Sequence, residues 1–266
     1  MIDGHIHSPY CPHGTSDTLE SYVEQAIKSG YTSMTFTEHA PLPPSFNDPV
    51  PTRDSGMNPR LLEAYINDVS KVKKIYESDI EVKVGLEVDY ISGFDEETKH
   101  FLNQYGRFLD DSILSVHFLP IKNNWYCIDY SSSVYKEAIA ASGNINNLYQ
   151  LYFDTLVQSV SADLGVYKPD RIGHMTLIKK FQQLYEPPAE WEQMATFFLD
   201  CAKEGSMTLD YNGAGINKEH CKEAYPPTNI ARKASAKGIP LIYGSDAHNS
   251  FAITQGYHAL DPSIIR

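Results

Sequence analysis

The chain has 266 residues, 42% hydrophobic and 21% charged, which is typical of a globular protein and excludes a disordered or repetitive one. The formal net charge is -12, from 22 basic and 34 acidic residues, and such a surface repels the phosphate backbone of nucleic acid. We therefore expect no nucleic-acid partner. The length predicts one large domain over residues 1–266.

The sequence has no feature of a secreted or membrane protein. Its first residues lack the basic and apolar regions of a signal peptide, and no run approaches the roughly 18 apolar residues of a membrane span. The four cysteines are too few and too scattered for a disulfide scaffold, so we expect reduced thiols. These observations predict a cytoplasmic protein without a membrane partner. They leave its oligomeric state open.

Short β-rich runs alternate with amphipathic stretches along the whole chain. Strands are predicted at residues 2–7, 33–38, 81–89, 112–117, 171–174, 207–212 and 240–245. Helices are predicted at 18–29, 59–77, 145–164, 189–204 and 228–237. Parallel strands joined by crossover helices indicate an α/β fold. Seven such repeats favour a barrel whose active site lies on the loops beyond the C-terminal ends of the strands.

Two longer segments interrupt this alternation. Residues 40–57 contain five prolines, so this segment cannot be a helix and is better interpreted as a stiff lid or wall over the site. Residues 122–143 show no clear periodicity. They are compatible with a hairpin or with a surface excursion.

Seven of the ten histidines lie at or just after the ends of predicted strands. A single histidine in such a place is more often hydrogen-bonded locally than bound to a metal. A barrel would gather all seven into one cleft, however, and imidazole is a common ligand of transition metals. The seven are His5, His7, His13, His39, His117, His174 and His248.

The strongest local patterns are at the first and last predicted strands. His5 and His7 are separated by one residue, so both side chains lie on one face and can reach one ion. Asp246 and His248 repeat that spacing after the last strand. Glu87 ends the third strand, where Gly85 on the same face leaves room for a ligand, and its carboxylate could bridge two metals. By itself Glu87 would be interpreted as a surface residue.

The other candidates are weak individually. His39, His117 and His174 each end an apolar strand, and His13 lies in the loop after the first strand, from which it could reach the same cleft. Cys11 is also in that loop. It could be a further metal ligand, but a buried free thiol is at least as good an interpretation.

Taken together, these motifs resemble the polymerase and histidinol phosphatase (PHP) family over nearly the whole chain. The shared motifs, in chain order, are His-x-His, Thr-Glu-His, Gly-Leu-Glu, Ser-Val-His, Gly-His and Gly-Ser-Asp-Ala-His. Four longer stretches are similar to the monofunctional histidinol-phosphate phosphatase branch: Asp3-Gly4-His5-Ile6-His7, Cys11-Pro12-His13-Gly14, Glu38-His39-Ala40-Pro41-Leu42-Pro43 and Lys168-Pro169-Asp170-Arg171-Ile172-Gly173-His174.

The resemblance implies a distorted (β/α)7 TIM-like barrel with three divalent cations. The first would be held by His5, His7, Glu87 and Asp246, the second by Glu87, His117 and His174, and the third by His13, His39 and His248. Zinc, iron or manganese would all suit nitrogen and oxygen ligands of this kind.

The implied activity is hydrolysis of L-histidinol phosphate, a small phosphate monoester, to L-histidinol and phosphate in histidine biosynthesis. A hydroxide bridging two ions at Glu87 would attack phosphorus in line. The leaving alkoxide needs a proton donor, for which His248 and Asp246 are candidates, although both are also expected to be metal ligands.

Three further residues are predicted to bind the substrate. Arg171 is the first candidate for clamping the phosphate, because a guanidinium group suits bidentate recognition of its oxygens. An unbroken strand would point Arg171 away from His174, so an outward ion pair is the alternative. Arg53, in the proline-rich segment, is the second candidate. Asn212 is expected to line the cleft, touching the ligand or orienting a metal-bound water.

Two other functions are compatible with the sequence. Another phosphoesterase of the same family could act on a nucleotide or a different small phosphate, although the acidic surface disfavours a nuclease. A metal-binding or regulatory protein on a degraded barrel is the non-enzymatic alternative. The presence of a suitable residue at all nine predicted ligand positions argues against it.

Overall fold

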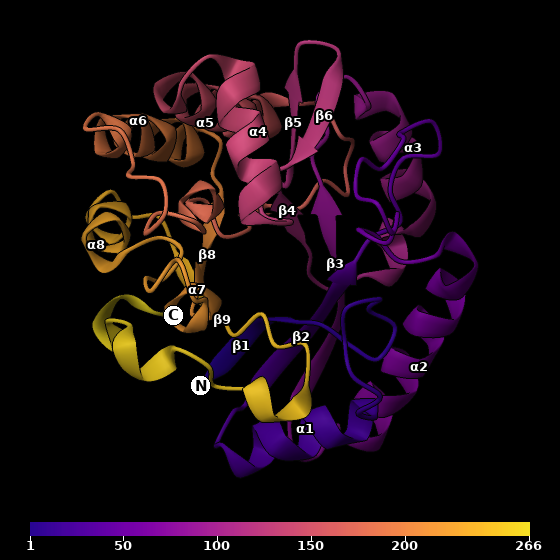
Figure 1. Cartoon of the computed structure of the whole chain (residues 1–266). Coiled ribbons are helices and arrows are strands. Elements are labelled where there is room, and N and C mark those ends of the chain that lie inside the picture. Colours follow the sequence, from indigo (N-terminus) through magenta and orange to yellow (C-terminus); the bar gives the residue numbers. More distant parts are fainter.

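Seven parallel strands form a ring at the centre of the chain, seen in a computed structural model that describes residues 1–266 (Figure 1). In spatial order the strands are β1 (Ile2–Ile6), β2 (Ser33–His39), β3 (Glu81–Asp89), β4 (Ile113–Ser115), β7 (Arg171–Ile172), β8 (Thr208–Asn212) and β9 (Leu241–Gly244). The two edges of the sheet meet through a parallel bridge between Ile6 and Ala247 and a hydrogen bond from the Asp246 amide to the His5 carbonyl oxygen (2.7 Å). The predicted distorted (β/α)7 barrel is therefore confirmed.

All seven predicted strands are present, in the predicted order. β3 has the predicted bounds, because its alternating pattern is long and uninterrupted. The predicted strand at 171–174 is shorter than expected and ends at Ile172. His174 consequently lies in the loop beyond β7, and its direction is set by that loop rather than by strand alternation.

Helices surround the ring on the outside (Figure 1). Five correspond to predicted helices: α1 (Leu19–Lys28), α2 (Leu62–Ile75), α5 (Ile145–Ser161), α6 (Trp191–Glu204) and α8 (Thr228–Ala236). Three were not predicted: α3 (Asp95–Tyr105), α4 (Ser132–Ser142) and the short α7 (Ala214–Asn217). α3 buries only Thr98 and Leu102, so its sequence carries little apolar periodicity. No helix has both the length and the apolar character needed to cross a lipid bilayer.

The two irregular segments have definite structures. Residues 122–143 contribute to a hairpin of β5 (Phe118–Ile121) with β6 (Asn124–Cys127), followed by α4, so the hairpin was the correct alternative. The proline-rich segment forms no helix between residues 40 and 57, as predicted. Phe46 and Val50 of that segment pack against Phe118 in a small hydrophobic cluster of their own. This packing holds the segment as a fixed wall beside the barrel mouth.

A bulge in β1 changes which residues face the interior. The pairing of β1 with β2 shifts register between Asp3 and Ile6. Gly4 lies in this bulge, and a side chain there would meet the guanidinium of Arg171, 2.2 Å from the position of an added Cβ. The absence of a side chain at Gly4 therefore allows Arg171 to fill the barrel interior.

We expect Tyr65→Phe to lower the free energy of unfolding by about 1–3 kcal/mol, because buried backbone groups lose a partner. The buried Tyr65 hydroxyl on α2 donates a hydrogen bond shared by the carbonyl oxygens of Phe36 (2.9 Å) and Gly85 (2.7 Å) on β2 and β3. Tyr22→Phe on α1 is the matched control, since its equally buried hydroxyl makes no hydrogen bond. Urea unfolding measures both variants, and equal destabilisation would contradict this account.

Candidate metal centre

A cleft of about 510 Å³ opens at the C-terminal mouth of the barrel. Its walls include seven of the predicted site residues: His13, His39, Glu87, His117, His174, Asp246 and His248. His5 and His7 are fully buried and lie against Glu87 and Asp246. Parallel strands all end at the same mouth, which is why residues from distant parts of the chain meet there.

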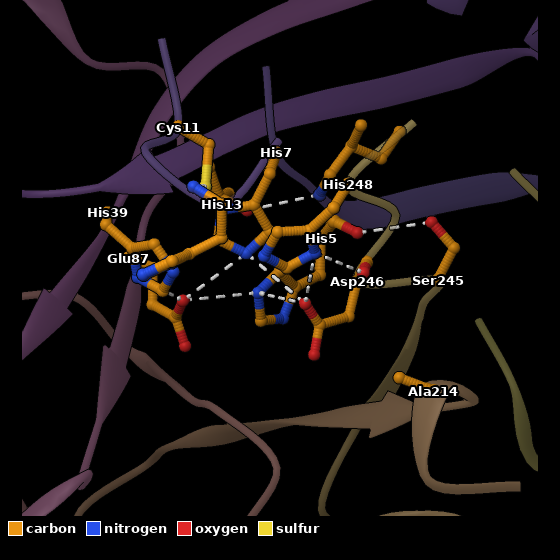
Figure 2. A network of polar contacts seen from close by, with 12 residues as sticks. His5, His7, Cys11, His13, His39, Glu87, Ala214, Ser245, Asp246 and His248 are labelled. Atoms are coloured by element: carbon orange, nitrogen blue, oxygen red, sulfur yellow. Dashed lines mark hydrogen bonds and ion pairs between the residues drawn. The ribbon is translucent and has the colours of Figure 1, made fainter. Parts of the chain in front are cut away.

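The first ligand group lies against one oxygen of Glu87 (Figure 2). The Nε2 atoms of His5 and His7 are 3.5 and 3.6 Å from Glu87 Oε2, and His7 Nε2 is 3.3 Å from Asp246 Oδ1. Both Nε2 atoms are buried and make no hydrogen bond. Two unpartnered nitrogens facing two carboxylates fit a cation between them. These four residues are the set that the family resemblance implied for the first ion.

The second ligand group faces the other oxygen of the same carboxylate. His174 Nε2 is 2.8 Å and His117 Nε2 is 3.7 Å from Glu87 Oε1. Ser115 Oγ donates a hydrogen bond to that oxygen as well (2.6 Å). His39 Nδ1 also lies 3.1 Å from Glu87 Oε2, so Oε2 faces three imidazoles and Oε1 faces two. This arrangement suits a carboxylate bridging two cations.

The third group gathers at the ring of His7. His39 and His248 lie beside the ring of His7, with ring centroids 4.3 and 4.0 Å from it. Their ligand atoms and those of His7 and Cys11 all lie within 4.8 Å of one another. His13 contacts Cys11 and His39 and lines the same cleft. Its side chain is 45% exposed at the rim, where Nε2 is 3.6 Å from Asp54 Oδ1.

Buried carboxylates orient several of the histidines from behind. His5 Nδ1 is 2.7 Å from Asp210 Oδ2, and His117 Nδ1 is 2.7 Å from Asp89 Oδ1. Such contacts fix the tautomer and turn Nε2 toward the centre. Neither carboxylate was predicted from the sequence, although strand alternation could have found Asp89, which follows Glu87 by two residues on β3.

Glu38 has the same role for His7. Its Oε1 is 3.2 Å from His7 Nδ1, and its Oε2 accepts hydrogen bonds from the amide and hydroxyl of Ser8. Burial opposes ionisation of Glu38, but the contacts with His7 lower its pKa to about 2. The motif Thr-Glu-His therefore contains a positioning residue next to the candidate ligand His39, a role that was not predicted from the sequence.

The charges at this centre depend on one another. Burial alone would lower the pKa of His5, but the carboxylates of Asp210 and Glu87 raise it to about 10. Burial likewise opposes ionisation of Glu87, while His5 and His117 hold its pKa well below the ordinary range. Without a cation, protons on His5 and His117, whose pKa values are both raised to about 10, balance the buried carboxylates. A bound cation can replace those protons, because only neutral imidazole ligates.

Asp246 has an unusual backbone conformation and a fixed side chain. Its φ is +54°, in the left-handed region that aspartate tolerates better than most residues. The side-chain amide of Asn212 donates hydrogen bonds to Asp246 Oδ2 (3.2 Å) and to Asp210 Oδ2 (3.0 Å). Asn212 is fully buried and is not part of the cleft wall. It orients two carboxylates of the site rather than lining the cleft as expected.

The two arginines predicted to clamp a phosphate lie outside the cleft. Arg171 is 1% exposed and forms an ion pair with Asp111 inside the barrel, at 2.6 Å between Nη2 and Oδ2. The prediction failed because the bulge at Gly4 makes space for this side chain in the interior. The alternative was an outward ion pair. Arg171 does form an ion pair, but the pair lies inside the barrel and not on its outer surface. Arg53 is exposed and does not line the cleft either.

A polar wall faces the candidate metal ligands across the cleft. Lys180 Nζ forms an ion pair with Asp129 Oδ2 at 3.0 Å, and Lys218 and Tyr130 line the same cleft. Burial lowers the pKa of Lys180, but the Asp129 carboxylate more than compensates and raises it. Lys180 is therefore a cation inside the cleft. The sequence analysis missed it, because no local pattern places this residue at the barrel mouth.

The fold and the ligand groups define a barrel that can hold several metal cations with histidines and carboxylates. The model of the PHP domain matches residues 3–214, and the chain belongs to this family. The resemblance seen in its motifs is thereby confirmed.

Relatives include proteins with a named activity. The chain is 46% identical to the histidinol-phosphatase of Bacillus subtilis over 259 residues, which covers 97% of both proteins. A Listeria monocytogenes protein assigned as histidinol phosphatase HisK has a crystal structure with a TM-score of 0.93 and 36% identity, covering 97% of this chain and 99% of that one. HisK of Lactococcus lactis, solved with zinc, L-histidinol and phosphate, shares the fold (TM-score 0.69, 16% identity) over 100% of this chain and 94% of that one.

We expect Asp210→Asn to weaken metal binding roughly 10- to 100-fold, because the ring of His5 loses the carboxylate that orients it. Chelator competition measures the change. Asp163→Asn is the control, since that carboxylate pairs with Lys99 on the surface. Equal affinities in Asp210→Asn and in the unmodified protein would show that the contact does not support metal binding.

We also expect metal loading at pH 7 to release protons, and metal affinity to rise with pH. The metal-free pKa of His5 is about 10, so its ring is protonated at pH 7 and must lose that proton to become a ligand. Calorimetric titrations in buffers of different ionisation enthalpy count the released protons. Binding without proton release would contradict the charge state derived for His5.

Proposed function

We propose that this chain is a metal-dependent phosphomonoesterase that hydrolyses L-histidinol phosphate to L-histidinol and phosphate in histidine biosynthesis. The observation that carries the metal-dependent reaction is the buried carboxylate of Glu87, with three imidazoles at Oε2 and two at Oε1, beside a cleft large enough for a small phosphate ester. Support for the substrate comes from the Bacillus relative, which is named a histidinol-phosphatase and aligns over nearly the whole chain.

The centre fits divalent transition metals, and we propose three per chain. The donor atoms are imidazole nitrogens and carboxylate oxygens, which suit zinc, iron or manganese. The unpartnered Nε2 atoms of His5 and His7 are the specific sign that a cation belongs there. Bound cations supply Lewis acidity toward the phosphate and activate water as the nucleophile.

Asp246 is the proposed carrier of the proton. Burial opposes its ionisation, but His5 and His7 keep its pKa well below the ordinary range, so the carboxyl group is ionised before reaction. An ionised carboxylate can take the proton of the attacking water and deliver it to the leaving oxygen. The Asn212 amide holds Asp246 in place for this transfer. His248 Nδ1 lies 3.0 Å from the Asp246 carbonyl oxygen, so His248 supports the left-handed backbone there.

Lys180 replaces Arg171 as the proposed phosphate contact. It lines the cleft together with Glu87 and Asp246, and its ammonium carries a positive charge. Asp129 positions the ammonium from behind at 3.0 Å. Asp129 also lines the cleft as an acceptor for the amino group of the substrate, a contact that a phosphate ester without an amino group would not make.

The substrate assignment is tested by comparing turnover of three substrates by the metal-loaded enzyme: L-histidinol phosphate, a nucleoside monophosphate and a short DNA strand. We expect kcat/KM to be highest for L-histidinol phosphate. Preference for either of the others would instead assign the chain to a nucleotide-cleaving activity. Absence of all phosphomonoesterase activity in the loaded protein would support a purely metal-binding role.

We expect Glu87→Ala to lose both metal and activity, because this one carboxylate faces imidazoles at both of its oxygens. Elemental analysis and phosphate release measure the two effects together. Glu87→Gln is the near-isosteric companion, which keeps the volume and removes the charge, so it separates ligand loss from a packing defect. Full metal content in Glu87→Gln would contradict the bridging role.

Lys180→Met should raise KM for L-histidinol phosphate at least about tenfold, because a desolvated charge–phosphate contact is worth more than ~1.4 kcal/mol. Its metal content should stay unchanged. Lys179→Met is the matched neighbour, since Lys179 pairs with Glu223 and lies over the ring of Trp191, away from the cleft. An equal rise of KM in both variants would show a general structural effect and contradict the phosphate contact.

A further inference from the structure

Asp246 reaches the first ligand group only in an unfavourable backbone conformation. Its φ of +54° lies in the left-handed region, where a residue with a side chain is strained. In this conformation Asp246 Oδ1 lies 3.3 Å from His7 Nε2 and 3.9 Å from His5 Nε2. A change of φ to the ordinary negative range would redirect the carboxylate. Such strain persists only where surrounding contacts hold the backbone in place.

Strand β1 holds the amide groups on one side of this turn. The Ser245 amide donates a hydrogen bond to Asp3 Oδ1 (2.9 Å), and the Asp246 amide donates one to the His5 carbonyl oxygen (2.7 Å). Neither carbonyl oxygen of Ser245 and Asp246 accepts a hydrogen bond from a backbone amide. The barrel strands therefore fix the amides of the turn and leave its carbonyl groups to a side chain.

The carboxamide of Gln255 holds both carbonyl groups. Its Nε2 donates hydrogen bonds to the carbonyl oxygens of Ser245 (2.5 Å) and Asp246 (3.2 Å). The φ angle of Asp246 is the dihedral angle between the carbonyl carbons of these two residues, so one group that holds both carbonyls restrains φ directly. His248 Nδ1 also lies 3.0 Å from the Asp246 carbonyl oxygen, but it contacts only that one.

Gln255 is itself held in a fixed place. The segment after β9, yellow in Figure 1, contains no strand and brings Gln255 to the barrel mouth, where it lines the cleft. Its carbonyl oxygen accepts a hydrogen bond from the Tyr243 hydroxyl (2.8 Å), and its Oε1 lies 3.5 Å from Asn217 Nδ2. Gly213 packs against the same backbone, since an added Cβ there would stand 2.3 Å from the Gln255 carbonyl oxygen. These contacts direct Nε2 toward the turn.

We propose that Gln255 is a positioning residue that holds Asp246 in its left-handed conformation, so that the carboxylate stays directed at His5 and His7. It acts through the backbone and needs no contact with the imidazoles. A residue that supplied only packing would not require an N–H donor at this place, whereas this role does. The proposal rests on the metal binding and the proton transfer proposed above for Asp246.

Gln255→Met tests the role, because it keeps the length of the side chain and removes the donor. At saturating metal, kcat for L-histidinol phosphate should fall roughly tenfold or more while KM changes little, since the Lys180 contact is unaffected. Metal affinity should weaken roughly tenfold, as for other groups that orient ligands. Gln255→Glu keeps the shape and points an ionised carboxylate at two carbonyl oxygens, so it should be impaired at least as much. Phosphate release and chelator competition measure these effects.

Asn217→Ala and Tyr243→Phe are the matched controls. Each removes another hydrogen bond of Gln255 and leaves the contacts of Nε2 in place. Both variants should keep kcat and metal affinity, although Tyr243→Phe should unfold at a lower urea concentration. Urea unfolding also verifies that the Gln255 variants are folded. If Gln255 merely tied the C-terminal segment to the barrel, the controls would lose activity as well.

Three results would overturn the proposal: unchanged kcat and metal affinity in folded Gln255→Met, an equal loss in the two controls, or a rise of KM at unchanged kcat, which would make Gln255 a substrate contact. Failure to hydrolyse L-histidinol phosphate would reject the proposed substrate and leave the difference in metal affinity measurable. If the unmodified protein bound no metal, the proposed function would fail. A crystal structure of Gln255→Met would still decide the positioning role, which a retained positive φ at Asp246 would contradict.

Discussion

A carboxylate buried at the centre of a protein is unfavourable unless positive charge surrounds it, and Glu87 is 1% exposed. Nitrogens of five histidines lie within 3.7 Å of its two oxygens: His5, His7, His39, His117 and His174. The charge can be balanced by protons on His5, His7 and His117, whose pKa values are raised, or by cations that the rings ligate. The second arrangement leaves the rings neutral, and carboxylates stand behind three of them, His5, His7 and His117, so the buried network favours metal.

The barrel brings these groups together by closing on itself. β1 and β9 come from opposite ends of the chain, and their contact places the ligands of the first group side by side. Glycines make the close approach possible. A side chain at Gly244 would stand 2.1 Å from Asp210 Oδ1, and one at Gly173 would stand 2.1 Å from Ser115 Oγ. Both positions lie behind the ligands and keep the supporting groups in contact with them.

The net charge of the protein affects where an anionic substrate can be attracted. A chain with a net charge of -12 repels anions in general. Cations in the cleft and the ammonium of Lys180 would reverse that repulsion locally, so that an anionic ester is attracted at one place only. The Asp129 carboxylate lies beside Lys180, so this wall of the cleft carries both a negative and a positive charge. Such a wall suits a substrate that carries both phosphate and amino groups.

The sequence by itself determined the parallel barrel, the order of its strands and the histidines and acids at their C-terminal ends, because strand alternation is a local property that neighbouring residues reveal. It did not reveal α3 or α4, whose short apolar faces carry little periodicity. Contacts across the barrel were decided only by the tertiary structure. Asp210 is 205 residues from the His5 that it orients, and a bulge in β1 makes the space for Arg171.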